Sequence, residues 1–130
     1  MREIKFRVWD KILCGYSKNT MGWYHGENGI VSPETGDRYI FEQYTGLKDK
    51  NGTNEDIYEK DIMEFHAYGI HYIGVVEYHG SAFGIICRNT EVKASPFLDD
   101  AIDRHGAIKI GNIHDNPELI HDQKAEAEHD

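Results

Sequence analysis

Residues 61–88 read DIMEFHAYGIHYIGVVEYHGSAFGIICR, and this stretch decides the fold. It holds three runs of β-branched and aromatic residues, over 61–65, 72–78 and 82–88, which is the pattern of short β-strands. Residues 79–81 (HGS) separate the second and third runs as a hairpin turn does. Gly74 and Gly84 lie inside two of these strands, where glycine marks a bulge, a sharp bend or the close approach of another backbone.

The segments before this stretch add two strands and a turn. Apolar residues occupy every second position of 4–8, while Arg7 and Trp9 share the other face, so residues 4–8 predict a half-buried strand. Residues 15–37 are rich in Gly, Asn, Ser and Thr and predict a loop, with one short strand around Trp23. Residues 38–45 (RYIFEQYT) predict a second strand. The turn DKNG follows at 49–52, where we expect Gly52 to take a positive φ.

The segment after it predicts one helix and one more strand. Ser95 suits the N-cap, Pro96 the first helical position and Gly106 the end of a helix near residues 96–105. Residues 107–110 return to a strand pattern.

Together these elements predict a mainly β fold. We expect about seven short strands and one short helix, arranged as a small, coiled, SH3-like barrel-type sheet. The order of strand, loop and glycine-bent hairpin over 61–78 is similar to the start of such barrels. A chain of 130 residues is sufficient for one core, which we expect over residues 1–121. Residues 122–130 form a polar tail that we expect to be frayed.

Composition restricts the function. The 14 basic and 23 acidic residues give a net charge of -9, which argues against binding to double-stranded nucleic acid. We expect no contact with a membrane, since no apolar run approaches the length of a bilayer span and no signal-peptide core is present at the start. Cys14 and Cys87 are far apart in the sequence, and we expect core thiols in a reducing cytoplasm.

The chain contains four motifs, which are RVWD at 7–10, QYTGLKDKNG at 43–52, IYEKDI at 57–62 and IGNIHDNPEL at 110–119. Together they resemble the YopX family of phage and prophage proteins. The resemblance implies a mainly β protein from a phage or an integrated phage genome, in the cytoplasm of a bacterial host, without an established activity. Two features depart from the family: residues 53–56 lengthen the loop after Gly52, and Lys60 stands where glycine is common.

We expect the motif residues to be structural or to form an interface, and not to line a pocket. They are Arg7, Trp9, Asp10, Tyr44, Gly46, Asp49, Gly52, Ile57, Tyr58, Asp61, Gly111, Asn112, Asn116 and Pro117. Several of these come from strand ends beside turns, so we expect the N-terminal strand to lie against segment 57–65. The Asp61 carboxylate is predicted to accept backbone hydrogen bonds from residues 55–60.

Residues capable of chemistry are present, but without the spacing of known sites. The histidines form two groups, neither with the spacing of a zinc-binding motif: His66, His71 and His79, and then His114 and His121. We interpret them as solvent-facing histidines and expect no metal or cofactor. Carboxylates are ligands that Mg²⁺ prefers, so the acidic residues at 49–61 allow the hypothesis of a metal-dependent hydrolase. It is the weakest of the hypotheses considered. No nucleophile motif is present, so we expect no catalytic residue.

The function that these observations favour is that of a non-enzymatic protein-interaction module. The 12% aromatic content and the short strands favour a homo-oligomer, and a host or phage protein is a further partner. The alternative is binding of single-stranded nucleic acid through the face of Trp9 and Arg7, because aromatic rings stack on bases.

Overall fold

The computed structural model describes residues 5–17, 38–79, 81–87 and 96–120. The predicted strand at Trp23, the Ser95 cap, His121 and the 122–130 tail lie outside these residues. Within them the chain forms eight strands and helix α2 (Leu98–His105). The predicted mainly β class is confirmed, as two antiparallel sheets, one of them curved into half a barrel. No helix in this part of the chain is long and apolar enough to cross a bilayer.

The N-terminal sheet has the strand order β2-β1-β3-β4. Its strands are β1 (Phe6–Asp10), β2 (Gly15–Tyr16), β3 (Tyr39–Lys48) and β4 (Asp56–Tyr58). β1 pairs with β3 from Phe6↔Gln43 to Asp10↔Tyr39. The register of β3 and β4 shifts between Tyr44 and Lys48, and Gly46 in that interval has a φ of 87°. This left-handed conformation explains the glycine at this motif position.

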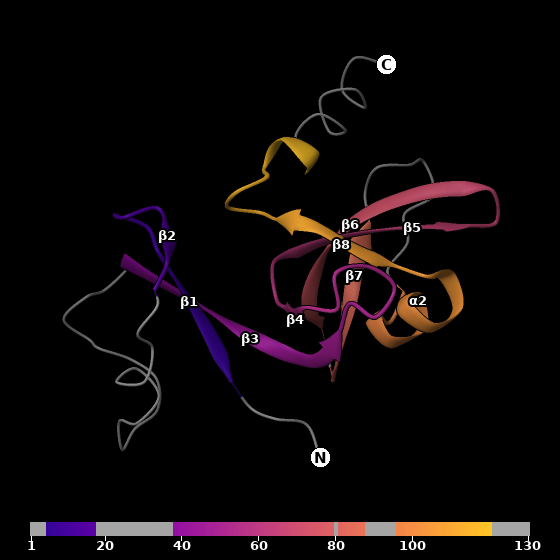
Figure 1. Cartoon of the computed structure of the whole chain (residues 1–130), viewed down its shortest axis with the longest axis horizontal. Coiled ribbons are helices and arrows are strands. Elements are labelled where there is room, and N and C mark those ends of the chain that lie inside the picture. Colours follow the sequence, from indigo (N-terminus) through magenta and orange to yellow (C-terminus); the bar gives the residue numbers. More distant parts are fainter. Residues whose placement is uncertain (1–4, 18–37, 80, 88–95, 121–130) are drawn as a thin grey trace.

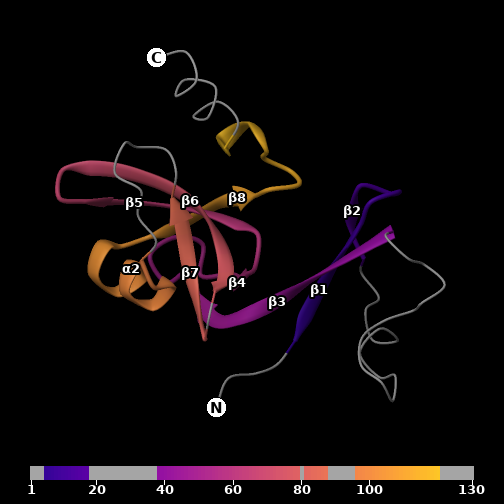
Figure 2. The same ribbon diagram turned by 180° about the vertical axis from the view of Figure 1, so that it is seen from behind.

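The C-terminal sheet has the order β7-β6-β5-β8. Its strands are β5 (Asp61–Ala67), β6 (Ile70–His79), β7 (Ala82–Cys87) and β8 (Ile108–Asn112). The three runs quoted from 61–88 are therefore strands, and the hairpin between β6 and β7 is confirmed by the pair His79↔Ala82. Figures 1 and 2 show β1 and β2 at one end of the longest axis and α2 at the other.

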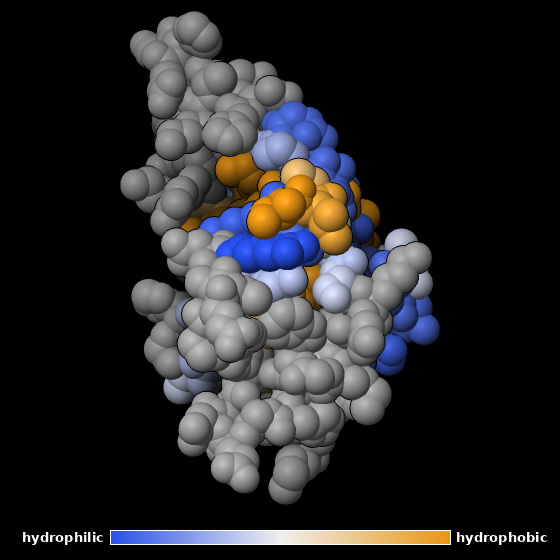
Figure 3. Space-filling view, turned by 90° about the vertical axis from the view of Figure 1, so that its left-hand side faces the viewer, coloured by the Kyte–Doolittle hydropathy of each residue, from blue (hydrophilic) through white to orange (hydrophobic). Residues whose placement is uncertain are grey.

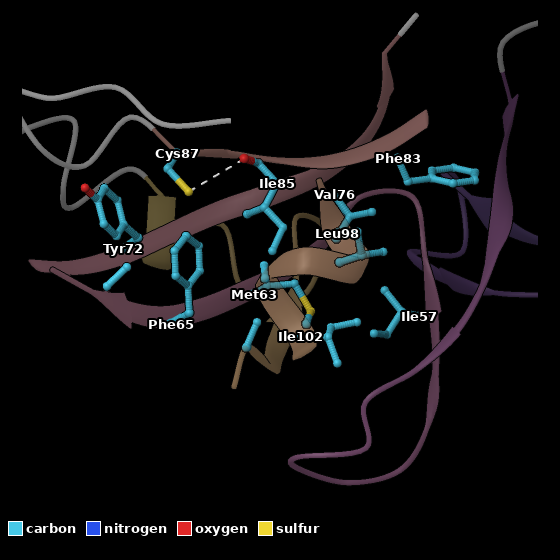
Figure 4. Packing of buried hydrophobic residues seen from close by; sticks show 13 residues of the cluster. Ile57, Met63, Phe65, Tyr72, Val76, Phe83, Ile85, Cys87, Leu98 and Ile102 are labelled. Atoms are coloured by element: carbon cyan, nitrogen blue, oxygen red, sulfur yellow. Dashed lines mark hydrogen bonds between the residues drawn. The ribbon is translucent and has the colours of Figure 1, made fainter. Parts of the chain in front are cut away.

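The core lies between the C-terminal sheet and α2. Apolar side chains from β5, β6 and β7 meet Leu98 and Ile102 of the helix, and Ile57 of β4 joins them (Figure 4). Ile57, Met63 and Ile85 are fully buried. Burial of such side chains stabilises the fold by roughly 1.5–3 kcal/mol each.

The two glycines inside β6 and β7 permit close approach of a neighbour. A Cβ at Gly74 would collide with the Ile86 carbonyl and the Cys87 side chain, and one at Gly84 would lie 3.1 Å from the Pro96 carbonyl oxygen. Gly84 pairs with Phe97 as an isolated bridge. Of the three predicted roles for these glycines, close packing is the one confirmed.

The two ends of α2 differ in how well they follow the prediction. Gly106 ends the helix in the left-handed region, at φ 65°, as expected. The predicted start was wrong, because the N-cap is Phe97 and no side chain caps it. Pro96 lies before the helix, where its carbonyl accepts the Ile85 N–H at 3.0 Å. Pro96, which the sequence pattern assigned to the helix, is therefore hydrogen-bonded to the edge of β7 instead.

Two further predictions were wrong. Gly52 is not among the residues with positive φ, and Asn54 takes that conformation with φ 60°. Gly52 is instead crowded, because a Cβ there would overlap the Asp49 carboxylate. Cys14 is exposed at the turn after β1, whereas Cys87 is buried as expected. Burial raises the pKa of the Cys87 thiol to about 12.

Candidate functional site

A buried charge network joins the two sheets, and Arg7 of β1 lies at its centre. The Arg7 Nε donates to Glu42 Oε1 at 2.8 Å. Its Nη2 donates to Asp61 Oδ1 at 2.8 Å and to the Glu59 carbonyl at 3.1 Å. Burial works against the charge, but Asp61, Tyr16 and Glu42 outweigh it and raise the pKa of Arg7. One guanidinium therefore connects β3 of the first sheet to β5 of the second.

Glu42 is fully buried, and both of its carboxylate oxygens are occupied. Oε1 accepts from Arg7 and from the Tyr16 hydroxyl at 2.9 Å. Oε2 lies 2.6 Å from Nε2 of His114. Burial raises the pKa of Tyr16, so its hydroxyl remains a donor. A buried carboxylate is tolerated only with such partners.

Asp61 is the second fully buried carboxylate. Its Oδ2 accepts the Tyr58 N–H at 2.8 Å, which confirms the predicted backbone hydrogen bond. Lys109 Nζ of β8 lies 3.4 Å from the same oxygen. Burial raises the pKa of Asp61, while Arg7 and Lys109 act in the opposite direction. Asp61 thus fixes the β4–β5 turn and anchors the network.

Aromatic rings enclose the network. Trp9 stacks on His114 with ring centroids 4.2 Å apart and planes 7° from parallel. Tyr16 meets Trp9 edge-on at 5.0 Å, and the Arg7 guanidinium lies 4.4 Å from the Tyr16 centroid and 4.9 Å from that of Tyr58. Trp9 keeps 7% of its surface exposed, so it is unavailable for stacking on bases. The geometry therefore does not support the nucleic-acid alternative.

The turn after β8 places His114 against this network. Asn112 Oδ1 accepts the N–H groups of His114 and Asp115, both at 2.9 Å. Asn116 Oδ1 in turn accepts the Asn112 N–H at 3.2 Å. A Cβ at Gly111 would overlap the Asn116 side chain, so this position favours glycine. Three motif residues thus build the turn that carries His114.

A second cluster forms around the turn at 49–54. Asp49 is fully buried. Its Oδ2 accepts the N–H of Thr53 at 3.2 Å and that of Lys109 at 3.0 Å. Asn51 Nδ2 donates to the Ile102 carbonyl at 2.9 Å, near the C-terminus of α2. The turn therefore attaches the β3–β4 connection to β8 and to the helix.

The comparisons with known proteins agree with these motifs. The YopX family model, described as "YopX protein", matches residues 5–121. The chain belongs to the YopX family. Among solved structures, this YopX chain is similar to the crystal structure of protein EF1440 from Enterococcus faecalis. The two share 25% identity and a TM-score of 0.58, over 92% of this chain and 99% of the other. A search of the curated proteins gives no match.

The motif residues of this YopX chain divide between several places. Arg7, Trp9, Tyr58 and Asp61 meet around the charge network, which joins the N-terminal strand to segment 57–65. Tyr44 lies beside Tyr58, with ring centroids 5.5 Å apart, and Ile57 enters the core. Asp49 and Gly52 form the second cluster, and Gly111, Asn112 and Asn116 form the C-terminal turn, where the Pro117 carbonyl accepts the Ile120 N–H at 3.1 Å.

Asp10 has a separate role at the end of β1. Its Oδ1 accepts the N–H groups of Ile12 and Leu13 at 2.9 and 3.2 Å. Its two oxygens also accept Nε and Nη2 of Arg38, at 3.0 and 2.9 Å. These hydrogen bonds from Arg38 lower the pKa of Asp10. Asp10 therefore fixes residues 11–14, the hairpin tip, in one conformation.

Sequence reasoning missed Glu42 and took His114 only for a metal ligand or a solvated residue. The signal for Glu42 was present: it is the one acidic residue inside the aromatic strand pattern RYIFEQYT. No sequence spacing relates it to His114, which lies 72 residues further along.

The geometry assigns structural work to these carboxylates. Glu42 and Asp61 accept hydrogen bonds at both oxygens from groups of this chain, and the carboxylate of Asp56 pairs with Lys5 and Lys48 at 2.6 and 2.9 Å. No group of three or more histidine, cysteine, aspartate or glutamate residues in the described ranges is placed to hold a metal ion. His66 and His71 stack at 4.5 Å on the exposed β5–β6 hairpin.

Proposed function

We propose that this YopX protein is a non-enzymatic interaction module that associates with further copies of itself through the hairpin tip. The observation that carries the proposal is the exposure of two adjacent aliphatic side chains there. Ile12 is 68% exposed and Leu13 is 73% exposed. Figure 3, which looks at this end of the molecule, shows apolar surface directly beside strongly hydrophilic surface.

The rigidity of the tip favours binding. Asp10 holds the N–H groups of both aliphatic residues, and Arg38 holds Asp10. In addition, the Lys11 N–H donates to the Arg38 carbonyl at 2.8 Å. A tip that is already ordered loses little conformational entropy on association, which strengthens binding. Self-association through the tip accounts for the presence of the motif residue Asp10 at a turn that covers no part of the core.

The use of the buried carboxylates supports the non-enzymatic part of the proposal. A general base or a metal ligand needs an oxygen that can reach a substrate or an ion. Glu42 and Asp61 are both fully buried and hydrogen-bonded within the chain. From the family resemblance of the chain we also propose that it is a phage or prophage protein and that it assembles in the cytoplasm of a bacterium.

Light scattering coupled to size-exclusion chromatography tests the proposal. The average mass of the wild-type protein is expected to rise with concentration. The double variant Ile12→Asp/Leu13→Asp is expected to stay monomeric, with an unchanged circular dichroism spectrum. Tyr68→Asp is the matched control, because Tyr68 is 91% exposed at another turn, and it is expected to associate like the wild type. A wild-type protein that is monomeric throughout, or a tip variant that still associates, contradicts the proposal.

A further inference from the structure

A shallow groove lies between the β3–β4 connection and α2. Its volume is about 330 Å³, at the small end of the roughly 300–1,000 Å³ typical of ligand pockets. Leu47 and Ile102 give it apolar surface, Lys48 and Lys50 lie on the side of the connection, and Asp99 and Asp103 lie on the helix. The motif residue Gly46 also lines it, so the prediction that motif residues line no pocket was wrong for this glycine.

The groove and the hairpin tip lie far from each other in the same molecule. Figures 1 and 2 show the β1–β2 hairpin and α2 at opposite ends of the longest axis. The tip of one molecule therefore cannot enter its own groove. A contact between the two features requires two copies of the chain.

The two surfaces match in chemical character and in charge. The tip offers two aliphatic side chains and the exposed Lys11, and the groove offers apolar surface bordered by acidic residues of α2. Lys50 already pairs with Asp103. The Asp99 carboxylate accepts the N–H of Asp100 at 2.8 Å and is the acid that remains to face a lysine. Opposite charges at the rim of an apolar contact guide orientation and partner choice.

We propose that this groove receives the hairpin tip of a second copy, with Lys11 of the tip facing Asp99 of the groove. This inference rests on the proposed self-association and names its acceptor surface. Because tip and groove are different surfaces, the contact is head-to-tail, and it builds a ring or an open filament instead of a closed twofold dimer. A tip-to-tip contact is disfavoured, because it brings Lys11 of each copy close to Lys11 of the other.

Mixing two defective variants tests the inference. The tip variant Ile12→Asp/Leu13→Asp keeps an intact groove, and the groove variant Asp99→Lys/Asp103→Lys keeps an intact tip. Each variant alone is expected to be monomeric in light scattering, with self-association at least roughly tenfold weaker than that of the wild type. Mixed in equal amounts, they are expected to form a species of two chains and no larger one, because only one contact can form. Asp100→Lys is the matched control on the same helix and is expected to assemble like the wild type.

Disulfide capture gives a second, independent reading. Cys14 lies exposed in the tip, so Asp99→Cys is expected to yield a ladder of disulfide-linked oligomers under mild oxidation. Asp100→Cys is expected to yield fewer.

The outcomes separate the inference from the proposed function. If the wild type never associates, both fail. If the tip variant is monomeric but the groove variant assembles like the wild type, self-association through the tip stands and the groove is not its acceptor. If both variants are monomeric and their mixture forms no two-chain species, the head-to-tail contact is wrong.

Discussion

At the scale of the single residue, the clearest backbone strain lies at Lys60. Its φ of 72° is in the left-handed region, which side chains other than glycine rarely adopt. The surroundings hold it there, since the Lys60 N–H donates to the Val76 carbonyl at 2.8 Å and its carbonyl accepts the Ile113 N–H at 3.0 Å. The position where the family resemblance led us to expect glycine therefore has a backbone conformation that favours glycine. The lysine found there does not prevent the Asp61 geometry.

Lys60→Gly is expected to stabilise the protein. Relief of the left-handed conformation stabilises the folded protein by about 1–2 kcal/mol. Two effects reduce this gain: glycine has a greater conformational entropy in the unfolded chain, and the Lys60–Glu77 ion pair, at 2.7 Å, is lost. Lys60→Ala loses the ion pair without relief of the backbone. We expect the glycine variant to unfold in urea with a free energy about 1 kcal/mol above that of the alanine variant. The reverse order would show that the backbone is not strained.

Gly52→Ala is expected to destabilise the protein by about 1–3 kcal/mol, the usual cost of overpacking. The cause is the Asp49 carboxylate, which occupies the place of the new methyl group. In the background of Asp49→Ala the same change is expected to cost less, so the two substitutions are not additive. Gly15→Ala, which meets no atom within 4 Å, serves as the control in thermal unfolding. Equal costs in both backgrounds would contradict this explanation.

At the scale of the element, one side chain joins three segments of the N-terminal sheet, including β1 and β4, which share no ladder. Asp56 of β4 pairs with Lys5 just before β1 at 2.6 Å and with Lys48 of β3 at 2.9 Å. The Lys5 hydrogen bond is the main cause that lowers the pKa of Asp56 from 3.8 to about 2, and Lys48 adds to it. The three strands at this end of the sheet are thus connected through one carboxylate.

The stability contributed by Asp56 is expected to depend on pH. Because its pKa is lower in the folded protein, the ionised group stabilises the fold above its ordinary pKa, and this contribution disappears as the pH falls from 3.8 towards about 2. Asp56→Asn is expected to cost about 1 kcal/mol at pH 7, as for partly exposed pairs. Urea unfolding of both proteins between pH 7 and 2.5 measures the difference. A difference that is constant over this range would contradict the assignment.

The elements predicted from sequence are those with a strong local pattern. The runs of β-branched and aromatic residues over 61–88 and at 38–45 correctly predicted β3, β5, β6 and β7, because such residues favour the buried surface of a sheet. The start of α2 was not predictable, since Pro96 is held by Ile85 of a strand edge, a tertiary contact. The candidate site followed the same rule. The Asp61 backbone bond is local and was predicted, whereas the contact between His114 and Glu42 depends on the arrangement of both sheets.

At the scale of the whole molecule, the charge network is the main polar connection between the two sheets in the described part of the chain. Arg7 pairs with Glu42 and with Asp61, each from a different sheet and each fully buried. Replacing a buried pair by apolar groups is often tolerated, but removing one partner leaves a charge without compensation. Within this network, Arg7 is the residue whose side chain pairs with a buried carboxylate of each sheet.

Arg7→Met is expected to destabilise the protein by about 3–5 kcal/mol, the usual cost of an uncompensated buried charge. Adding Asp61→Asn to this variant is expected to restore part of the loss, since one of the two buried carboxylate charges that lose Arg7 is then removed. Arg7→Lys is also expected to be poorly tolerated, because an ammonium cannot reproduce the planar set of donors. Chemical denaturation of the single and double variants measures the coupling. An additive double variant would show that Arg7 and Asp61 act independently.

The stacking of His114 on Trp9 has a consequence for the order of events during synthesis. The network draws on positions 7, 42, 61 and 114, and its longest hydrogen bond, from His114 to Glu42, spans 72 residues. A growing chain exposes Glu42 to water long before the ribosome has added the histidine that completes its shell. The N-terminal strands therefore cannot complete their tertiary contacts before the C-terminal segment has been synthesised. Contacts between residues so distant in sequence also slow folding. The protein is expected to acquire its tertiary structure in one late step, when the segment after β8 becomes available.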